Sequence, residues 1–381
     1  MWKEKTVNMV KQNHPSSSLM SKVLQDLTDG CDSQVQPPGT KATKSTNHFP
    51  EPEVDIPRIA DAIASELKSG HMAGPFSPGI IPEAKINGLI SIKKPNGSRR
   101  QVGNLSDPPG FSFNDNINPA VLHEWKVNAT TTKQFADKII RAGRNSVMSC
   151  SDMTNAYKNL PVKLSQRRLQ VFQFCGKQFV DLRLIFGDKC ACMFFDRFHH
   201  CIIWNFVWPL VNIPVSWVGR TIDDVTTVSP EGSEENTLTF VKQYREILTD
   251  LNIGAAPEDP LRRKAFDCAQ EGEVLGTIFN TQNMTWKMPE EKLSIFISLL
   301  NTAIQDGETL TLHNVEVIHG KLNNLIQLSP PLNFLVTEVL IFLKELLTRF
   351  YEDGLNDRHT AQYSVSADMR FDLRSLKAIL K

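Results

Sequence analysis

Three aspartates stand at places in the sequence where their carboxylates could act together. Asp152 follows a short apolar stretch, and the adjacent Asp223 and Asp224 interrupt a second one. Neighbouring side chains of an extended strand point to opposite faces of a sheet, whereas a tight turn can bring both toward one point. Carboxylates that converge can hold two divalent ions for phosphoryl transfer. Ligand sets made only of oxygen favour Mg²⁺ or Mn²⁺ over zinc.

The surroundings of Asp223 and Asp224 make the pair informative. Two adjacent aspartates are common in solvated turns and alone say little about function. Here apolar runs lie on both sides, over residues 215–222 and 225–228. Burying an unpaired carboxylate costs free energy, so a buried hairpin seldom carries two of them without a reason. The pattern favours a two-ion site, provided that the strand ending at Asp152 lies next to this hairpin.

The elements expected to position these aspartates alternate between hairpins and helices. Apolar residues at spacing four predict a helix over 56–68, and the turn signal Pro95-Asn96-Gly97 predicts a hairpin over 88–106. A strand over 146–151 should end on Asp152. Further elements are expected as hairpins over 171–184 and 275–286, helices over 131–142 and 189–208, a helix after Ser233, and mainly helices from 290 to 381. The fold class is therefore α+β.

The N-terminal residues differ in composition from the rest. Residues 14–52 are rich in Ser, Thr, Pro, Gln and Asn and contain few large apolar residues. This composition is typical of disorder, so we expect residues 1–55 to be a disordered leader. No secretory signal is apparent. The apolar stretch 201–218 is short for a bilayer span and contains two prolines, so no membrane partner is expected.

Cysteine content and charge point to an intracellular protein with a basic region. The seven cysteines form no even framework, which favours reduced thiols in the cytoplasm or nucleus. The Cys and His residues between 190 and 201 match no zinc spacing and are expected to pack in a core. The net charge is zero, but residues 82–189 hold 17 Lys/Arg against 8 Asp/Glu. Such a region suits a phosphate backbone, although ordinary surface charge is an alternative.

Five segments, in order, resemble the motifs of reverse transcriptases, the RNA-directed DNA polymerases. The resemblance covers about residues 56–381. The segments are Ile92-Lys93-Lys94-Pro95-Asn96-Gly97-Ser98-Arg99-Arg100 (fingers hairpin), Ser151-Asp152-Met153-Thr154-Asn155-Ala156-Tyr157 (motif A), Phe186-Gly187-Asp188-Lys189-Cys190-Ala191-Cys192 (motif B), Thr221-Ile222-Asp223-Asp224 (motif C) and Leu275-Gly276 (primer grip).

The resemblance implies a right-hand polymerase fold and a nucleotidyltransferase activity. Residues 56–145 would be mostly fingers. Residues 146–289 would form the palm, with a fingers hairpin at about 165–186. Residues 290–381 would form a helical thumb or connection that stops before an RNase H domain. The implied partners are a primed RNA or DNA template and deoxynucleoside triphosphates.

The same resemblance implies residue roles. Asp152, Asp223 and Asp224 would be catalytic residues and would ligate two Mg²⁺ or Mn²⁺ ions. Tyr157 would stack under the sugar of the incoming nucleotide and reject a 2′-hydroxyl group. A core aromatic residue is the alternative interpretation of Tyr157.

The remaining implied roles concern the nucleotide and the primer. Lys93 and Arg100 would hold the triphosphate, because cations on a mobile hairpin can close over phosphates. Gly187 would let the backbone approach the nucleotide, and Leu275 and Gly276 would contact the primer. Solvated turns and an ordinary turn glycine are the alternatives for Lys93, Arg100 and Gly187.

Further segments resemble retroelements of the DIRS type, which carry a tyrosine recombinase. They are Glu66-Leu67-Lys68-Ser69-Gly70, Ala73-Gly74-Pro75-Phe76, Ser112-Phe113-Asn114-Asp115 and Ser366-Ala367-Asp368-Met369-Arg370-Phe371-Asp372-Leu373. The chain would then be part of a longer retrotransposon protein.

Three positions depart from the family pattern. Thr221 replaces an aromatic residue, Cys192 replaces a proline, and Asp259 stands where a lysine is expected, with Lys264 close by. None removes a metal ligand, but each could lower activity. A second hypothesis therefore stays open, a catalytically decayed or domesticated nucleic-acid-binding protein. A primase-type enzyme is disfavoured by Tyr157.

Overall fold

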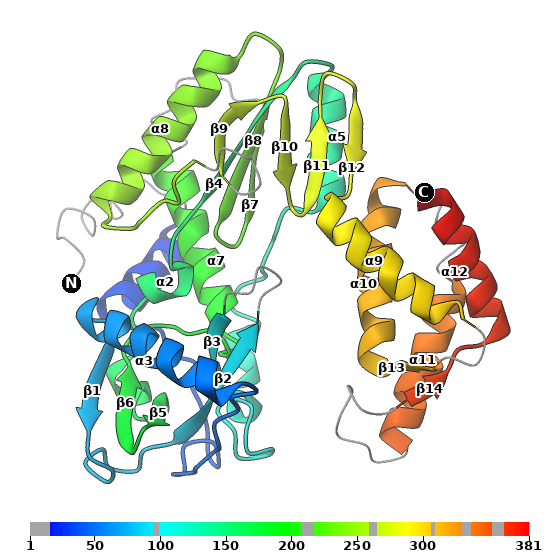
Figure 1. Ribbon diagram of the computed structural model, residues 1–381. Helices are drawn as coiled ribbons and strands as arrows, with labels where there is room; N and C mark the ends of the chain where they lie inside the picture. Colours follow the sequence, from blue (N-terminus) through cyan, green and yellow to red (C-terminus); the bar gives the residue numbers. More distant parts are fainter. Residues whose placement is uncertain are drawn as a thin grey trace. The chain divides into compact units, whose positions relative to one another are not determined.

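The computed structural model describes residues 16–93, 99–207, 217–258, 265–305, 309–329, 337–352 and 362–380 (Figure 1). The chain divides into two compact units. The first comprises residues 1–129, 151–226 and 235–257, and the second comprises residues 130–150, 227–234 and 258–381. The polymerase subdivision into fingers, palm and thumb stays a prediction.

A five-stranded sheet forms one part of the first unit. Its strand order is β1-β6-β5-β2-β3. The predicted hairpins are confirmed: β2 pairs with β3 from Gly88↔Asn104 to Lys93↔Arg99, and β5 pairs with β6 from Val171↔Val180 to Phe174↔Lys177. The turn at Pro95-Asn96-Gly97 lies outside the described residues. The strands are β1 (Met72–Phe76), β2 (Ile86–Lys93), β3 (Arg99–Asn104), β5 (Val171–Phe174) and β6 (Lys177–Asp181).

Helices of the first unit follow the predicted apolar periods. Helix α3 (Pro52–Lys68) begins four residues before the predicted start, because Pro52 suits the first turn of a helix, where its missing N–H is not needed. The predicted helix over 189–208 is α7 (Ala191–Cys201), which continues as the π-helical segment η3 (Ile202–Val207). The other helical segments are η1 (Asn114–Asn116), α4 (Pro119–Leu122), η2 (Ala156–Asn159), α6 (Leu164–Arg167) and α8 (Glu234–Asp250).

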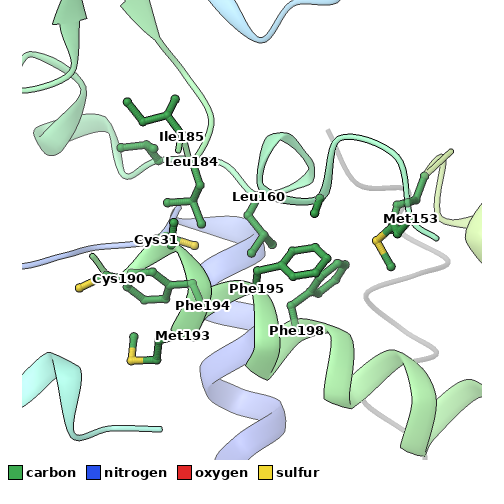
Figure 2. Packing of buried hydrophobic residues seen from close by; sticks show 14 of the residues in the cluster. Cys31, Met153, Leu160, Leu184, Ile185, Cys190, Met193, Phe194, Phe195 and Phe198 are labelled. Atoms are coloured by element: carbon green, nitrogen blue, oxygen red, sulfur yellow. The ribbon is translucent and has the colours of Figure 1, made fainter. Parts of the chain in front are cut away.

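Helix α7 lies at the centre of the largest hydrophobic core. Phe194, Phe195 and Phe198 are buried and face apolar side chains from other segments, among them Leu160 and Met153 (Figure 2). Cys190 and Cys201 are buried in the same core, as expected for packing residues. Among the described residues, no helix combines the length and apolar character that crossing a membrane requires.

The predicted disordered leader is wrong for residues 16–52. Helix α2 (Ser17–Thr28) begins at Ser16, whose side chain accepts a hydrogen bond from the Leu19 N–H. Its apolar positions Met20, Val23 and Leu27 are buried in the core around α7. Few apolar residues suffice here because they recur on one helical face and fill an existing core. Residues 1–15 of the predicted leader lie outside the described residues.

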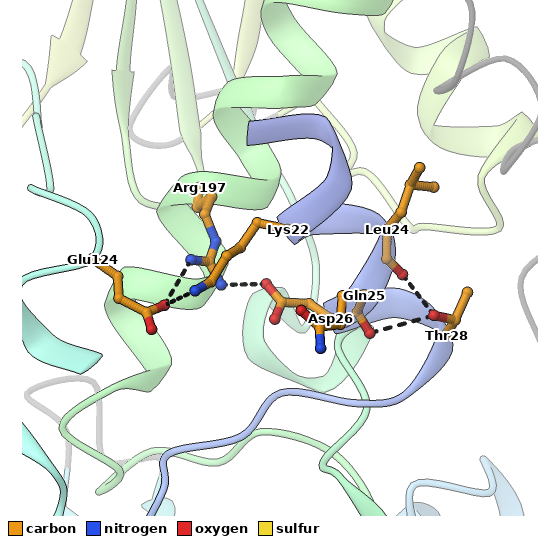
Figure 3. Close-up of polar contacts among 7 residues, drawn as sticks. All are labelled: Lys22, Leu24, Gln25, Asp26, Thr28, Glu124 and Arg197. Carbon is orange, nitrogen blue, oxygen red and sulfur yellow. Dashed lines mark hydrogen bonds and ion pairs between the residues drawn. The ribbon is translucent and has the colours of Figure 1, made fainter. Parts of the chain in front are cut away.

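Buried ion pairs also hold α2 in place. The Arg197 guanidinium group, on α7, lies 2.5 Å from the Asp26 carboxylate and 3.4 Å from that of Glu124 (Figure 3). Lys22 reaches the same Glu124 carboxylate at 2.6 Å. Burial raises the pKa of Asp26 to about 6, although Arg197 opposes this shift. The N-terminal segment is thus part of the packed first unit.

A second sheet has the order β7-β8-β4-β9 and confirms the predicted hairpin around the paired aspartates. The predicted strand before Asp152 is β4, which is buried from Val147 to Ser151. Between β4 and β8, the hydroxyl groups of Ser149 and Thr227 are hydrogen-bonded at 2.6 Å. The strands are β4 (Val147–Asp152), β7 (Trp217–Thr221), β8 (Asp224–Ser229) and β9 (Phe266–Ala269).

The second unit contains a small antiparallel sheet and a helical part. The predicted hairpin over 275–286 belongs to three strands, β10 (Glu271–Val274), β11 (Thr277–Asn280) and β12 (Thr285–Lys287). Phe279 of β11 contacts Phe135 of α5 (Thr132–Ala142), the helix predicted over 131–142. The helical part comprises α9 (Glu290–Ala303), α10 (Leu312–Leu328), α11 (Thr337–Glu352) and α12 (Ala367–Leu380), with strands β13 (Thr309–Thr311) and β14 (Gln362–Ser364). The α+β class is confirmed.

Candidate metal centre and nucleotide pocket

Three half-buried carboxylates converge at the ends of β4 and the β7–β8 hairpin. One oxygen each from Asp152, Asp223 and Asp224 lies within 4.8 Å of the others. Among the described residues, these three are the His, Cys, Asp or Glu side chains that lie close enough together to hold a metal ion. The Cys and His residues of α7 do not form such a group. The proximity expected from the sequence is therefore present in the first unit.

Main-chain hydrogen bonds fix the two aspartate-bearing segments to each other. The Met153 N–H donates to the Asp223 carbonyl oxygen at 3.1 Å. On the other side, the Ala256 N–H donates to the Asp152 carbonyl oxygen at 2.8 Å, and the Thr154 N–H donates to that of Gly254 at 2.8 Å. The positions of the carboxylates thus depend on backbone pairing, which moves less than a flexible side chain.

The hairpin turn lies one residue earlier than the sequence suggested. Ile222 and Asp223 form the turn, and Asp224 is the first residue of β8. Ile222 has φ +51°, which a β-branched residue rarely adopts and which costs on the order of 1–3 kcal/mol. A strained residue of this kind persists only where its surroundings hold it, and here α7 supplies the contact.

His199 of α7 holds the turn from inside the core. Burial lowers its pKa to about 3, so the imidazole is neutral at neutral pH. A carbonyl oxygen can only accept, so Nδ1 carries the proton and donates to the Ile222 oxygen. Nε2 then accepts from the Tyr244 hydroxyl group at 3.0 Å. The tautomer is determined by these two partners.

One face of α7 supports the centre through three side chains. Cys192, Asp196 and His199 recur at spacings of four and three, which places them on the same side of a helix. Asp196 accepts from Arg220 of β7 at 3.0 and 3.1 Å and from the Trp125 indole N–H at 2.7 Å. Sequence reasoning missed Asp196 and His199 as supporting residues, although their helical spacing was a usable signal.

Tyr157 lies beside the carboxylates on the short helix η2. Its ring is half-buried, 4.8 Å from the Phe186 ring and 5.9 Å from the Phe195 ring. Its hydroxyl group is hydrogen-bonded to the Cys192 thiol. Burial raises the pKa of Tyr157, and the thiol and the Asp223 carboxylate raise it further. The hydroxyl group is therefore a neutral donor in a site with negative charge nearby.

Arg100 joins the same group of aromatic residues. Its guanidinium carbon lies 4.6 Å from the centroid of the Phe186 ring, a cation–π distance. Arg100, Tyr157 and Phe186 line a cavity of about 230 Å³ in the first unit. Sequence reasoning included Phe186 in a motif but assigned it no role. In the structure it connects the predicted phosphate-binding arginine to the predicted sugar-contacting tyrosine.

Lys93 takes a different position. Its side chain is 62% exposed and its ammonium group lies 3.5 Å from a Glu51 carboxylate oxygen. Glu51 also pairs with Arg99 at 2.7 Å, and Arg99 lies 3.1 Å from Asp55. Of the two predicted triphosphate ligands, the structure therefore places Arg100 at the cavity and Lys93 in an ion-pair network at the turn end of the β2–β3 hairpin.

Gly187 is required by a close backbone approach. Its φ is +112°, and a Cβ atom placed there would lie 2.2 Å from the Gly103 carbonyl oxygen of β3. The Gly103 N–H donates to the Phe186 carbonyl oxygen at 3.3 Å, and the Asn114 amide donates to the Gly187 carbonyl oxygen at 2.6 Å. The glycine thus lets the loop that carries Phe186 pack on β3; a contact with nucleotide stays a prediction.

Leu275 and Gly276 form the turn between β10 and β11 in the second unit. Their φ angles are +51° and +77°. The strands on either side pair from Glu271↔Asn280 to Val274↔Thr277. The expected hairpin after these two residues is formed by β11 and β12, and Leu275 and Gly276 themselves are the turn before it; their contact with a primer stays a prediction.

Comparisons with known proteins identify the fold. No protein-family model and no curated protein sequence matches this chain. Among solved structures, it is similar to the foamy viral protease-reverse transcriptase dRH in complex with double-stranded DNA (TM-score 0.53, 17% identity, 98% of this chain and 59% of that one). It is also similar to the foamy viral protease-reverse transcriptase in complex with an RNA/DNA hybrid (TM-score 0.56, 14% identity, 100% and 46%). This chain thus spans about half the length of those proteins, and its fold is similar to that of these reverse transcriptase structures.

Proposed function

We propose that this chain is a nucleotidyltransferase, an RNA-directed DNA polymerase that adds deoxynucleotides to a primer 3′-hydroxyl group. The observation that carries the proposal is the convergence of Asp152, Asp223 and Asp224 within 4.8 Å in a reverse-transcriptase-like fold. The assignment of the three residues as catalytic ligands comes from their motifs, and the geometry is compatible with it.

The donor set fits two Mg²⁺ or Mn²⁺ ions. All three side chains offer carboxylate oxygens, which such hard ions prefer. When bound, a pair of such ions activates an attacking hydroxyl group and stabilises the leaving oxygens. Asp152 and Asp223 would ligate both ions and Asp224 would support them. The backbone pairing between β4 and the hairpin turn would keep the carboxylates in register during the reaction.

The cavity lined by Arg100, Tyr157 and Phe186 supports a nucleotide substrate. Arg100 would bind triphosphate oxygens, with the Phe186 ring beneath its guanidinium group restricting its orientation. Tyr157 would lie under the sugar and disfavour a 2′-hydroxyl group by steric exclusion. Lys93 would reach the triphosphate by exchanging its exposed contact with Glu51 for phosphate, an exchange of low cost because surface ion pairs contribute about 0–1 kcal/mol.

The finer identity rests on sequence motifs. We propose that the chain is the fingers, palm and thumb or connection region of a DIRS-type retrotransposon protein. Its partners would be a primed RNA or DNA template and deoxynucleoside triphosphates, with Leu275 and Gly276 contacting the primer. Gly187 would lie close to the nucleotide through its packing on β3.

A second candidate is a decayed or domesticated nucleic-acid-binding protein with the same fold. Two departures from the family pattern favour it. The Cys192 thiol is hydrogen-bonded to the Tyr157 hydroxyl group, and Thr221 precedes the strained turn. The third departure, Asp259 with the nearby Lys264, lies outside the described residues. Both candidates predict nucleic-acid binding, so activity separates them.

Primer extension tests the proposal. The full chain is incubated with poly(rA)/oligo(dT), dTTP and either Mg²⁺ or Mn²⁺, alongside Asp223→Asn and the control Asp61→Asn, an exposed residue of α3. We expect extension by wild type and by Asp61→Asn and at least a hundredfold loss in Asp223→Asn. Titration with Mn²⁺ by electron paramagnetic resonance should show weaker binding in the same variant. If wild type extends no better than Asp223→Asn while both bind the duplex, the second candidate replaces the first.

A further inference from the structure

Helix η2 carries two neighbouring side chains that point into different surroundings. Tyr157 contacts Phe186 and Phe195, close to the carboxylates. Lys158 instead reaches the five-stranded sheet and α3, where its ammonium group meets the carboxylates of Asp181 and Glu66. The two residues are adjacent on one short helical turn, so the anchor of one side chain bears on the orientation of the other.

Lys158 is the centre of a largely buried charged cluster. Its ion pair with Asp181 of β6 is a close contact, and the Asp181 side chain is only 5% exposed. The distance from Lys158 to Glu66 is 3.6 Å, and Glu66 lies 3.1 Å from Nδ1 of His71. Lys158 and Asp181 both line the cavity that Arg100, Tyr157 and Phe186 line. The cluster is therefore continuous with the wall of the proposed nucleotide pocket.

Helix η2 has one residue in the core, Ala156, and its C-cap residue Leu160 is also buried there and accepts a hydrogen bond from the Leu184 N–H at 3.0 Å. It is a single turn of 3-10 helix, whose hydrogen-bond geometry is poorer than that of an α-helix. Asn155 precedes it with φ +53°. The Asn159 amide group donates at 3.2–3.3 Å to three carbonyl oxygens of the same segment, which shapes the turn but does not attach it to other elements. Besides Ala156, the side chains that attach η2 to other elements are Tyr157 on one side and Lys158 on the other.

The charged groups around Asp181 make the cluster depend on each of its members. The groups that face the Asp181 carboxylate are Lys158 of η2 and Glu66 of α3. Burial raises the pKa of Asp181 to about 6 even though Lys158 opposes this shift. Burial also lowers the pKa of His71, which faces Glu66, Lys158 and Arg183. Among the described residues, Lys158 is the cation that faces Asp181, so its removal would leave this buried carboxyl group facing only Glu66.

We propose that Lys158 and Asp181 are positioning residues that set the orientation of Tyr157 and, through it, the selection of deoxyribonucleotides over ribonucleotides. Only the second half of this inference, the effect on nucleotide selection, rests on the proposed function. The first half, that the Lys158–Asp181 pair positions the Tyr157 ring, concerns the molecule whether or not it is an enzyme. Neither residue needs to touch the nucleotide for this effect.

A matched set of variants separates positioning from general damage. Lys158→Met removes the pair, Asp181→Asn removes its negative charge but leaves an oxygen that can accept from Lys158, and Lys158→Arg keeps a cation in place. Lys163→Met is the control, because Lys163 lies in the same segment and forms a 2.7 Å ion pair with Asp32 away from η2. Thermal unfolding of each variant reports folding. Should Lys158→Met not fold, Asp181→Asn, which keeps the side-chain volume, carries the test.

Fluorine NMR reads the position of Tyr157 without requiring activity. The chain contains four tyrosines, so 3-fluorotyrosine labelling gives few resonances, and Tyr157→Phe assigns the one of interest. We expect this resonance to shift in Lys158→Met and Asp181→Asn, to return toward its wild-type position in Lys158→Arg, and to stay in place in Lys163→Met. An unmoved resonance in folded Lys158→Met and Asp181→Asn would overturn the proposal.

Nucleotide selection is the second readout. In primer extension, the ratio of kcat/KM for dTTP to that for UTP should fall about tenfold in Lys158→Met, equivalent to about 1.4 kcal/mol, and recover in Lys158→Arg. A shifted resonance with an unchanged ratio would overturn the effect on selection. If wild type extends no primer at all, the proposed function fails, and the fluorine spectra still decide whether Lys158 and Asp181 position Tyr157.

Discussion

At the scale of single residues, the candidate centre depends on backbone positions that only particular residues tolerate. Gly187 allows a loop to lie against β3, and Ile222 adopts a strained φ that His199 stabilises through a hydrogen bond. Both positions stand next to residues proposed to bind ligand. Strain at such places is common in functional sites, because the surrounding fold can hold a conformation that the local sequence disfavours.

Gly187→Ala should destabilise the protein by about 2 kcal/mol or more, because it combines a positive φ with a backbone clash. The added Cβ would lie 2.2 Å from the Gly103 carbonyl oxygen. Gly176→Ala is the control, since Gly176 also has a positive φ, +73°, but a Cβ atom there meets nothing within 4 Å. Its expected cost is about 1 kcal/mol. Urea unfolding measures both, and equal costs would contradict the close approach.

The aspartates could be predicted from sequence, whereas for their supports only the shared helix face could, and not the partners. Charged residues inside apolar runs are conspicuous, and Asp152, Asp223 and Asp224 needed only a hairpin and a neighbouring strand to meet. Asp196 and His199 were harder to recognise because a buried polar residue on an apolar helix has many possible partners. Which partner it finds depends on tertiary contacts between segments more than twenty residues apart.

At the scale of elements, helix α2 shows how a short polar segment can be structural. It contributes three buried apolar residues and one buried carboxylate that pairs with Arg197 of α7. Its composition predicted disorder because the average over residues 14–52 hides the periodicity within residues 17–28. Hairpins and long helices were predicted well, because alternation and a 3.6-residue period persist over many residues in them.

Arg197→Met should cost about 3–5 kcal/mol, because it leaves the Asp26 carboxylate buried without its cation. Lys22→Met is the matched control. Lys22 belongs to the same network, but its side chain is 40% exposed and it should contribute less than about 1 kcal/mol. Chemical denaturation gives both values, and proteolysis should show earlier cleavage within residues 16–50 of Arg197→Met. Similar losses in the two variants would argue against α2 as a buried structural helix.

At the scale of the whole molecule, buried carboxyl groups link stability to pH. Burial raises the pKa values of Asp26, Asp181 and Asp188 to about 6, above the ordinary value of 3.8. A group whose pKa is higher in the folded state stabilises that state when protonated. The contribution is complete below about pH 4 and is lost as the pH rises through 6.

Asp188→Asn should isolate one of these contributions. Asp188 accepts hydrogen bonds from the Cys190 N–H at 2.8 Å through Oδ1 and from the Ser33 hydroxyl group at 3.2 Å through Oδ2. Asparagine can accept the first through Oδ1 and donate to the Ser33 oxygen through its amide nitrogen. Between pH 4 and 6, the free energy of unfolding should therefore decline less steeply with rising pH in the variant than in wild type. Urea unfolding at intervals of half a pH unit measures this. Parallel curves for the two proteins would show that Asp188 titrates normally.

The first unit is built from three separate stretches of the chain, which affects how the protein folds during translation. Asp152 is held by a hydrogen bond from Ala256, and Asp26 pairs with Arg197, 171 residues later in the chain. During translation, neither partner exists when the earlier residue leaves the ribosome. Asp26 of α2 must therefore wait for Arg197, and the Asp152 carbonyl oxygen for Ala256, before these contacts can form. Contacts of such long separation slow folding, so we expect the newly made chain to depend on chaperones more than a protein built from local contacts.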